Sequence, residues 1–417
     1  MPFCTTRLAL FLALVLVLVL ALLGCSAPAE DRADQTASDQ QLIDQARRLA
    51  QEVLLLDTHV DIPYRLEAKM EDISKRTESG DFDYPRAREG GLDTAFMSIY
   101  VPAAYQETGG AKEYADRMID MVEGFERDHP DKFAVARSVD EVRSLFGTGK
   151  IAFPMGMENG APVEDELANL EHFHQRGIRY ITLTHSKANQ ICDSSYDPNR
   201  KWKGLSPFGR QVVEEMNRLG IMIDISHVSD ESFFQALELT KAPVIASHSS
   251  CRHFTPGWER NMSDEMIVRL AENGGVIQIN FGADFINDDY RKAADVHRQA
   301  VQAHLQANNL EPSDPAARQY IREYRQQNPL QFPDVSEVAD HIDHVRDLAG
   351  IDHVGLGSDF DGVQGSLPNG LRDVTMYPNL FAELLKRGYT REEIEKIASG
   401  NLLRVWGEVE RVARESE

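Results

Sequence analysis

The sequence predicts an α/β fold, a (β/α)8 TIM-like barrel with a helical insertion between strands 7 and 8. Two observations support this prediction. Eight short apolar runs alternate with amphipathic stretches, as in a parallel α/β sheet, and eight strands close such a barrel. Titratable residues follow six of these runs directly, and the carboxyl ends of barrel strands share one face. The runs cover residues 53–57, 92–99, 151–157, 179–184, 221–226, 243–247, 275–281 and 353–358.

The apolar run 8–23 near the N-terminus is predicted to be a signal-peptide core. It is shorter than the about 20 residues that a membrane-spanning helix needs, and it ends in Gly24-Cys25, which resembles a bacterial lipobox. We expect cleavage before Cys25 and lipidation of that residue; a plain membrane anchor is the alternative. The polar stretch 25–45 is predicted to be a flexible tether, because it shows no apolar period. The protein is then expected in the bacterial cell envelope, with its folded domain over 46–417.

The first predicted strand leads into His59 and Asp61. Residues two apart on a strand point to the same side, so these two side chains can bind one metal ion together. Glu158 follows the third run, and His227 and His248 follow the fifth and sixth. Imidazole and carboxylate are ligands of zinc and similar divalent ions. These five residues are therefore the predicted metal ligands.

Five ligands exceed the three that a single catalytic zinc takes from the protein, which favours a two-metal site. Glu158 is the candidate bridge, because it is the only acidic residue at the end of the third strand. Two such ions would activate a shared water and polarise a carbonyl. Asp359, after the eighth run, is then free to act as general base and later as acid. His185, after the fourth run, is either a further ligand or a group that stabilises an oxyanion.

Between the strands the sequence predicts helices and one insertion. Residues 167–176 and 208–219 have helical patterns, and Gly220 is expected to cap the second. The stretch 283–332 is charged and rich in glutamine. We expect it to form a helical hairpin over one end of the barrel, or to fray.

The other histidines are predicted to be structural. His341 and His344 lie three apart in a helical pattern, which places them on a solvated helix face. Structural roles are also expected for His172, His174 and His353.

Composition excludes some classes of function. Lys and Arg number 44 against 67 Asp and Glu, for a net charge of −23, whereas a nucleic-acid-binding protein needs a basic face. The four cysteines are too few for a disulfide scaffold. Cys192 and Cys251 follow the fourth and sixth strands, which are not neighbours, so free thiols are favoured over a disulfide between them. A soluble, acidic, globular protein remains.

Eight short motifs lie in order along the chain. They are DTHVDIP at 57–63, GME at 156–158, RYITLTH at 179–185, DISH at 224–227, SHSS at 247–250, RN at 260–261, GLGSDFDG at 355–362 and GNLLRV at 400–405. Together they resemble the membrane (renal) dipeptidase family, zinc metallopeptidases of the amidohydrolase-like barrel group, in a bacterial lipoprotein form. Asn159 departs from the glycine of many relatives. Residues 186–193 look like bacterial members, so substrate preference is not carried over from the animal enzymes.

The resemblance implies two Zn²⁺ ions per chain. One would be bound by His59 and Asp61, and the other by His227 and His248. Glu158 would bridge the two ions, which agrees with the role inferred from its place after the third strand.

The resemblance also implies substrate roles. His185 would contact the scissile carbonyl oxygen, and Asp359 would move the proton. Arg260 would hold the C-terminal carboxylate of the substrate, a task suited to a bidentate guanidinium. Arg252 is a competitor for that task.

The expected function is hydrolysis of the peptide bond of free dipeptides, including those with a C-terminal D-residue, by a metal-activated water. Another amidohydrolase reaction, on an N-acyl amino acid, lactam or lactone, is the first alternative, and loss of Arg260 would affect it little. A non-catalytic lipoprotein that binds metal or peptide is the second, but it would have no need of Asp359. The expected partners are a dipeptide and, through the N-terminal lipid, a membrane; a homodimer is compatible with the sequence.

Overall fold

The computed structural model describes residues 29–416, and the chain divides into two units at Ala46. The predicted signal peptide and the lipidation site Cys25 lie outside the described residues. Helix α2 covers Ala29–Glu52, so the prediction of a flexible tether over 25–45 is wrong from Ala29 onward. Residues 29–45 contain no glycine or proline and are rich in alanine and glutamine, which favour a helix even without an apolar period.

Eight parallel strands form the barrel of the second unit, and all eight predicted strands are confirmed. A bridge between Val60 and Phe360 joins the chain after the last strand to the first strand and closes the sheet. The strands are almost wholly buried, as expected where helices cover a parallel sheet. In the order of pairing they are β1 (Leu55–Val60), β2 (Leu92–Tyr100), β5 (Met155–Glu158), β6 (Ile178–Thr182), β7 (Met222–Asp224), β8 (Ile245–Ser249), β9 (Val276–Ile279) and β10 (Val354–Leu356).

The third predicted strand differs in detail, because Pro154 interrupts it. The run forms β4 (Ile151–Phe153) and β5 on either side of this residue, which has no N–H to donate to a ladder. β4 pairs with β2 and with a further strand, β3 (Phe133–Val135). The sequence did not predict β3, whose three residues are too few to show a period.

Helices cover the outside of the barrel. Four of them are preceded by a serine whose hydroxyl accepts a backbone N–H of the first turn: Ser138, Ser206, Ser229 and Ser263. The two predicted helices are confirmed as α8 and α9, and Gly220 caps α9 in the left-handed conformation at φ 78°. The helices are α3 (Ile62–Ala68), α4 (Tyr84–Gly90), α5 (Tyr105–Thr108), α6 (Ala111–Asp128), α7 (Val139–Leu145), α8 (Ala168–Gln175), α9 (Pro207–Leu219), α10 (Asp230–Leu239), α11 (Asp264–Glu272), α12 (Ala283–Ile286), α13 (Asp288–Ala307), α14 (Pro315–Gln327), α15 (Val335–Ala349), α16 (Tyr377–Lys386), α17 (Arg391–Glu395) and α18 (Asn401–Ser416).

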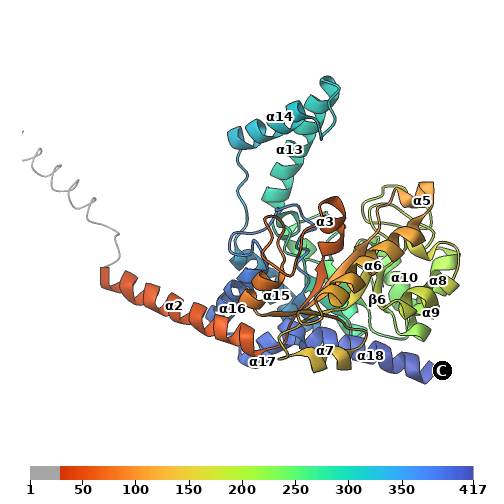
Figure 1. Ribbon diagram of the computed structural model, residues 1–417, viewed down its shortest axis with the longest axis horizontal. Coiled ribbons are helices and arrows are strands. Elements are labelled where there is room, and N and C mark those ends of the chain that lie inside the picture. Colours follow the sequence, from red (N-terminus) through yellow and green to blue (C-terminus); the bar gives the residue numbers. More distant parts are fainter. Residues whose placement is uncertain (1–28, 417) are drawn as a thin grey trace, which may run out of the picture. The chain divides into compact units, whose positions relative to one another are not determined.

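The last helix, α18, closes the amino-terminal end of the barrel. Trp406 is fully buried, and its ring lies 5.4 Å from the ring of Phe96. It shares a hydrophobic cluster with Met222, Ile245 and Val276, the first residues of β7, β8 and β9. Figure 1 shows α18 together with α7 on this side of the molecule. The carboxyl ends of the strands are therefore left for the functional site.

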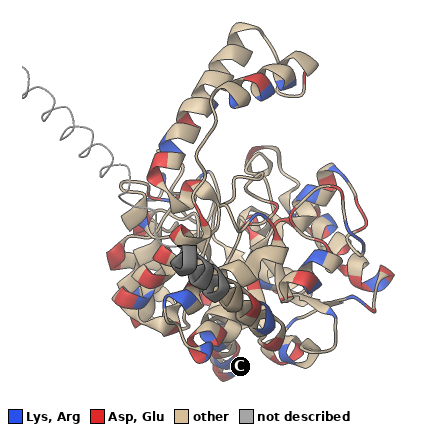
Figure 2. Ribbon diagram, turned by 90° about the vertical axis from the view of Figure 1, so that its left-hand side faces the viewer, with Lys and Arg blue, Asp and Glu red and all other residues tan. Residues whose placement is uncertain are grey.

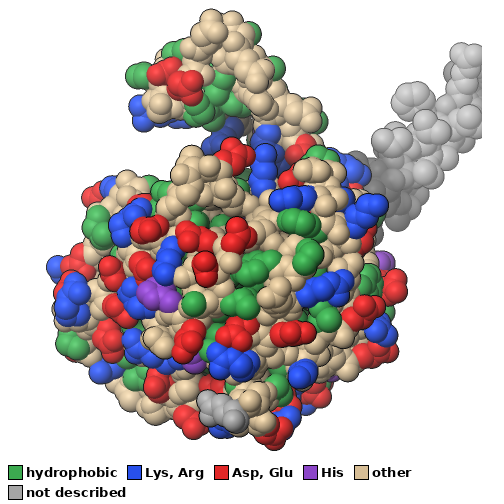
Figure 3. Space-filling view, turned by 90° about the vertical axis from the view of Figure 1, so that its right-hand side faces the viewer, with side chains coloured by type: hydrophobic (Ala, Val, Ile, Leu, Met, Phe, Trp, Pro, Cys, Tyr) green, Lys and Arg blue, Asp and Glu red, His purple; other side chains and the backbone are tan. Residues whose placement is uncertain are grey.

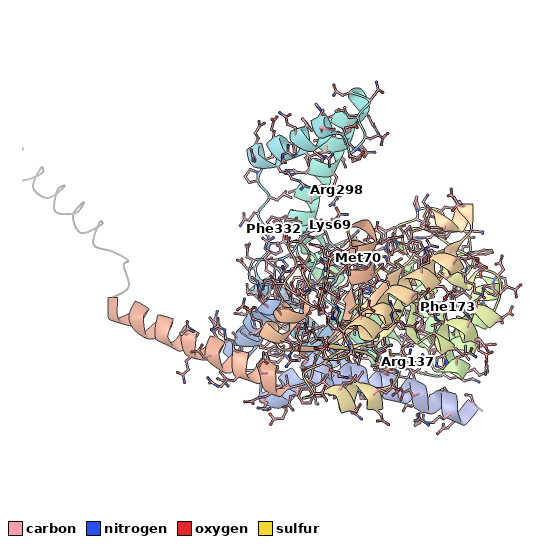
Figure 4. All side chains as sticks on the ribbon, in the orientation of Figure 1. Lys69, Met70, Arg137, Phe173, Arg298 and Phe332 are labelled. Carbon is pink, nitrogen blue, oxygen red and sulfur yellow. The ribbon has the colours of Figure 1, made fainter. Side chains whose placement is uncertain are left out.

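The insertion between strands 7 and 8 forms a helical hairpin of α13 and α14 (Figure 1). The expectation of a hairpin is confirmed over that of a frayed segment. Figure 4 labels Arg298 on α13 and Phe332 where the chain returns from α14. A cavity of about 730 Å³ lies between these helices and residues 362–366, in the loop after β10.

The surface mixes both signs of charge. Acidic and basic residues alternate along the outer helices in Figure 2, and they are interspersed on the face that Figure 3 shows. Within residues 29–416, no helix has the length and apolarity needed to cross a membrane.

Candidate metal centre and active site

Seven residues predicted from the strand ends lie together at the carboxyl-terminal face of the barrel. His59 is the second-last residue of β1, and Asp61 follows that strand directly. Glu158 ends β5, and His248 lies in β8. The other three each follow a strand by three residues, after β6, β7 and β10: His185, His227 and Asp359. The structure brings these side chains together at one end of the barrel, as predicted. Most of the short distances between them involve Glu158.

Glu158 divides its two carboxylate oxygens between two sets of imidazoles. Its Oε2 lies 3.4 Å from Nε2 of His59. Its Oε1 lies 3.1 Å from Nε2 of His227 and 3.4 Å from Nε2 of both His185 and His248. Asp61 joins the first set, with its Oδ2 3.5 Å from Nε2 of His59. A carboxylate whose oxygens face opposite ligand sets has the geometry of a bridge between two metal ions.

The side chains form three overlapping groups in which the ligand atoms are close enough to hold a metal ion. Each group is compact, with all ligand atoms within 4.8 Å of one another. His185 and Asp359 therefore lie as near to a metal position as the predicted ligands do, so geometry leaves His185 open as a ligand or a substrate contact. The groups are His59 with Glu158 and His248, Glu158 with His185 and His227, and His59 with Asp61 and Asp359.

Hydrogen bonds fix which ring nitrogen of His59 faces this centre. The hydroxyl of Tyr180 donates to the carbonyl of Thr58 at 3.1 Å, so it must accept from Nδ1 of His59, at 2.8 Å. In the neutral ring Nε2 of His59 then carries the lone pair, and this buried atom has no hydrogen-bond partner among the described residues. A buried, unprotonated Nε2 facing carboxylates is the state that a metal ligand requires.

Hydrogen bonds orient the ring of His248 in the same way. The carboxylate of Asp224 accepts the hydroxyl of Ser247 at 2.6 Å, and Ser247 Oγ therefore accepts from Nδ1 of His248 at 2.7 Å. Nε2 of His248 is left bare and lies 2.8 Å from Nε2 of His227. Two imidazole nitrogens this close share either a proton or a metal ion, and the bare Nε2 of His248 makes the donor set one that fits a metal ion.

Electrostatics agree with this fit. Burial lowers the pKa of His227 and of His248 well below the usual range, so both rings are neutral, the form that binds metals. Burial also acts to lower the pKa of His59, but Tyr180, Glu158 and Asp61 outweigh it and raise that pKa well above the usual range. This corner of the site therefore favours a positive charge, which a divalent cation would supply.

Asp359 is a buried carboxylate whose orientation is fixed by its neighbours. Its Oδ2 accepts from Nδ2 of Asn280 at 2.8 Å. Burial, reinforced by the carboxylates of Asp61 and Glu158, raises the pKa of Asp359 well above its usual range. Gly362 packs against it so closely that a Cβ there would lie 2.1 Å from Asp359 Oδ1. The carboxylate can therefore neither turn away nor ionise as easily as one in water.

The two candidate arginines have different surroundings. Arg260 is only 3% exposed, and its guanidinium donates to Ser249 Oγ and to the carbonyl of His248, each at 2.7 Å, while its Nε has no partner among the described residues. Arg252 instead makes a bidentate ion pair with Asp230, at 2.6 and 2.8 Å. Arg260 thus has an N–H donor without a partner among the described residues, beside the candidate metal centre. The guanidinium of Arg252 is already paired with Asp230.

The remaining predictions have mixed outcomes. Cys192 and Cys251 are both free and buried, as favoured. The prediction that His341 lies on a solvated face is wrong: it is fully buried, because the backbone N–H of Cys251 and the carbonyl of Ile286 pair with its two nitrogens. His344 is partly exposed on the same helix.

A family model described as membrane dipeptidase (peptidase family M19) matches residues 43–417. The chain belongs to this family. Dipeptidase tcpJ of Claviceps purpurea is 35% identical over 342 residues, which span 80% of this chain and 71% of that protein. The family members are metallopeptidases, so the chain is a metal-dependent hydrolase of the dipeptidase type, with the donor set described above as its metal-binding candidate.

Solved structures agree with the membrane dipeptidase assignment. The probable dipeptidase PvdM from Pseudomonas aeruginosa has a TM-score of 0.76 at 28% identity, covering 90% of this chain and 100% of that one. A metallopeptidase from Rhodobacter sphaeroides, solved with a phosphinate mimic of the dipeptide L-Ala-D-Ala, has a TM-score of 0.69 at 26% identity, covering 86% and 99% of the two chains.

Sequence reasoning missed the residues that orient the site. Tyr180 and Ser247 lie inside motifs already noted, but neither was singled out. Asn280 directly follows β9, the same place that the metal-type residues occupy after other strands, and this signal could have found it.

Proposed function

We propose that this membrane dipeptidase family member is a dizinc enzyme that hydrolyses free dipeptides, including those with a D-residue at the C-terminus. The observation that carries the proposal is the division of the Glu158 oxygens between two imidazole sets, beside a buried carboxylate and a guanidinium with spare donors. The relative that was solved with an L-Ala-D-Ala mimic supports the D-residue.

In this proposal His59 and Asp61 would hold one zinc ion, His227 and His248 would hold the other, and the carboxylate of Glu158 would serve both. Zinc bound in this way lowers the pKa of a water and polarises a carbonyl. The hydroxyls of Tyr180 and Ser247 support the ligands, since outer hydrogen bonds fix ring orientation and tautomer.

Asp359 takes the proton that the attacking water loses as its oxygen bonds to the carbonyl carbon. The same carboxyl then gives this proton to the amide nitrogen as the C–N bond breaks, which releases an amine and a carboxylate. Its raised pKa favours the protonated form that the second of these tasks requires. His185, whose side chain is 20% exposed, faces the substrate and stabilises the carbonyl oxygen.

The first test counts metal and measures hydrolysis on the full chain. We expect at least two zinc ions per chain at saturation and cleavage of L-Ala-L-Ala and L-Ala-D-Ala. Asp359→Asn should lose about 10²–10⁴-fold in kcat while it retains both zinc ions, as the loss of general acid-base catalysis predicts. Fewer than two ions, or no cleavage of any free dipeptide, would overturn the proposal.

A second test concerns Arg260, which we propose binds the substrate carboxylate. Removing a charge-assisted hydrogen bond of about 1.5–3 kcal/mol predicts a rise of roughly 10–100-fold in KM for Arg260→Ala. Arg322→Ala, on the exposed face of α14, serves as the control arginine. C-amidated dipeptides lack the carboxylate, so their hydrolysis should be slow and insensitive to Arg260→Ala. The alternative amidohydrolase reaction would be indicated if a lactone or lactam is hydrolysed faster than dipeptides and Arg260→Ala leaves that rate unchanged.

We also propose that the chain is anchored in the bacterial cell envelope, facing the periplasm or the outer surface, by lipid on Cys25. The apolar run 8–23 that ends in Gly24-Cys25 supports this. Cys25→Ala should abolish incorporation of labelled fatty acid and leave the precursor uncleaved. Normal labelling of that variant would contradict the proposal.

A further inference from the structure

A second cluster of metal-type side chains lies outside the catalytic centre. It consists of His253 in the short helical turn Arg252–Phe254, Asp264 at the start of α11, and His344 on α15. Their ligand atoms all lie within 4.8 Å of one another. None of the three belongs to the residues that surround Glu158, so the cluster is a separate feature of the surface.

Contacts already hold the three side chains together. Nε2 of His344 lies 2.8 Å from Oδ1 of Asp264. The ring of His253 stacks on that of His344 with centroids 4.4 Å apart. His253 makes no hydrogen bond to any residue in the described part of the chain; its other contact is with the ring of Phe254, at 4.9 Å. An exposed imidazole is thus positioned beside a second imidazole and a carboxylate, with its nitrogens unused.

We propose that these three residues bind a third divalent ion of the late first-row type, represented by Zn²⁺. Two imidazoles and one carboxylate are a common donor set for such ions. The exposure of Asp264 and His253 leaves the remaining coordination positions to water. A simple His–Asp ion pair would account for His344 and Asp264, but it would leave the stacked position of His253 without a cause.

The place of the cluster suggests what the ion does. His253 and Arg260 lie in one segment of the chain between β8 and α11. Its two ends meet in a parallel bridge at Cys251 and Met262, where the N–H of Arg252 donates to the carbonyl of Met262 at 2.8 Å. The backbone N–H of Met262 donates to Ser250 at 2.9 Å. An ion bound to His253 would link the first part of this segment to α11 and α15. The bound ion would then stabilise the segment that contains Arg260 from a position outside the active site.

The test titrates the full chain with Zn²⁺ and counts bound zinc per chain. We expect His253→Asn and His344→Asn each to bind one equivalent less than the unchanged protein. His172→Asn is the matched control, because His172 also pairs with a partly exposed carboxylate, Asp116 at 3.0 Å, but has no second imidazole in the pair. It should bind as much zinc as the unchanged protein. Because counting needs no activity, its outcome is independent of the dipeptidase proposal.

Two further measurements test the third metal site even if a variant folds poorly. Anomalous diffraction at the zinc edge from the unchanged protein should show a peak among His253, Asp264 and His344. Amide exchange over residues 250–262 should slow on adding zinc beyond catalytic saturation, and not in His253→Asn. Equal zinc counts in all proteins, no anomalous peak, unchanged exchange, or saturation only above about 1 mM zinc would overturn the third site.

Discussion

Single buried polar residues, rather than the metal ligands alone, determine the geometry of the catalytic face. Asp57 is an example, since it lies on β1 just before His59 and Asp61 but belongs to none of the groups of described residues that could hold a metal ion. Its carboxylate accepts from the backbone N–H of His59 at 2.9 Å and of Ser358 at 3.0 Å, and from the hydroxyl of Tyr377. Asp57 thus links the end of β1 to the segment that carries Asp359, and its role is positional.

His341 leads to a prediction about pH. Burial lowers the pKa of His341 to about 3, against 6.5 for an unburied histidine. Between these values the unfolded chain binds the proton and the folded chain does not, so stability rises with pH across this window and is lost as the pH falls from about 6.5 towards 3. The slope from this one group is at most about 1.4 kcal/mol per pH unit.

The measurement is the free energy of unfolding by denaturant at pH 7 and pH 5. His341→Gln keeps a donor and an acceptor but cannot take up the proton. We therefore expect it to be less stable than the unchanged protein at pH 7 and to lose less stability on acidification. Equal losses in both proteins would contradict a depressed pKa at His341.

At this scale the sequence predicted which side chains gather at the candidate metal centre, and not the residues that orient them. His59, Asp61 and Glu158 could be found because each stands at a strand end, a position visible in a one-dimensional pattern. Tyr180 reaches His59 across 121 positions of sequence, and such a contact exists only once the barrel has closed. The burial of His341 was missed for the same reason, since it depends on Cys251 and Ile286.

At the scale of elements, close packing between β5 and β6 sets the position of the orienting tyrosine. A Cβ on Gly156 would lie 1.9 Å from Cζ of Tyr180. The ring of Tyr180 therefore lies flat against a glycine of the neighbouring strand, and its hydroxyl reaches Nδ1 of His59. Glycine at 156 is required by this close approach rather than by backbone conformation.

Gly156→Ala is expected to damage the site through this contact. Because a fully packed core cannot absorb the methyl group, we expect a destabilisation of about 1–3 kcal/mol, together with weaker zinc binding as the ring of Tyr180 moves from His59. Gly407→Ala is the control: its Cβ would meet nothing within 4 Å, and in α18 alanine should stabilise by about 0.5–1 kcal/mol. Calorimetry and zinc titration provide the measurements, and unchanged zinc affinity in Gly156→Ala would exclude the role of Tyr180.

Elements with a clear period were predictable, and short or unpatterned ones were not. All eight barrel strands were found, but β3 was not, since its pairing with β4 is decided by the sheet and not by its three residues. Helix α2 was missed before Ala46 because no apolar period marks that part, whereas Leu49 and Ala50 of its last turns pack in the core. Gly220 was correct as a cap because the left-handed conformation it needs is local.

At the scale of the whole catalytic unit, the two ends of the barrel are stabilised by different means. The amino-terminal end is closed by apolar packing around Trp406 of α18. The carboxyl-terminal end gathers the carboxylates of Asp61, Glu158 and Asp359 with four imidazoles, all buried or nearly so. Buried charges of this density are costly unless a cation compensates them. The sequence could predict the second arrangement from strand ends and not the first, which needs tertiary packing.

This asymmetry predicts that metal removal loosens one end of the barrel before the other. Ions that bind only the folded chain stabilise it by about 2.7 kcal/mol when free metal is 100 times the dissociation constant. We expect a chelator to lower Tm by at least several degrees, and amide exchange to rise first in the segments after β1, β5 and β10. His344→Asn, which lacks the proposed outer site, should show nearly the same loss if the catalytic centre is responsible. Exchange that rises first around α18 would show instead that the apolar end is the weaker one.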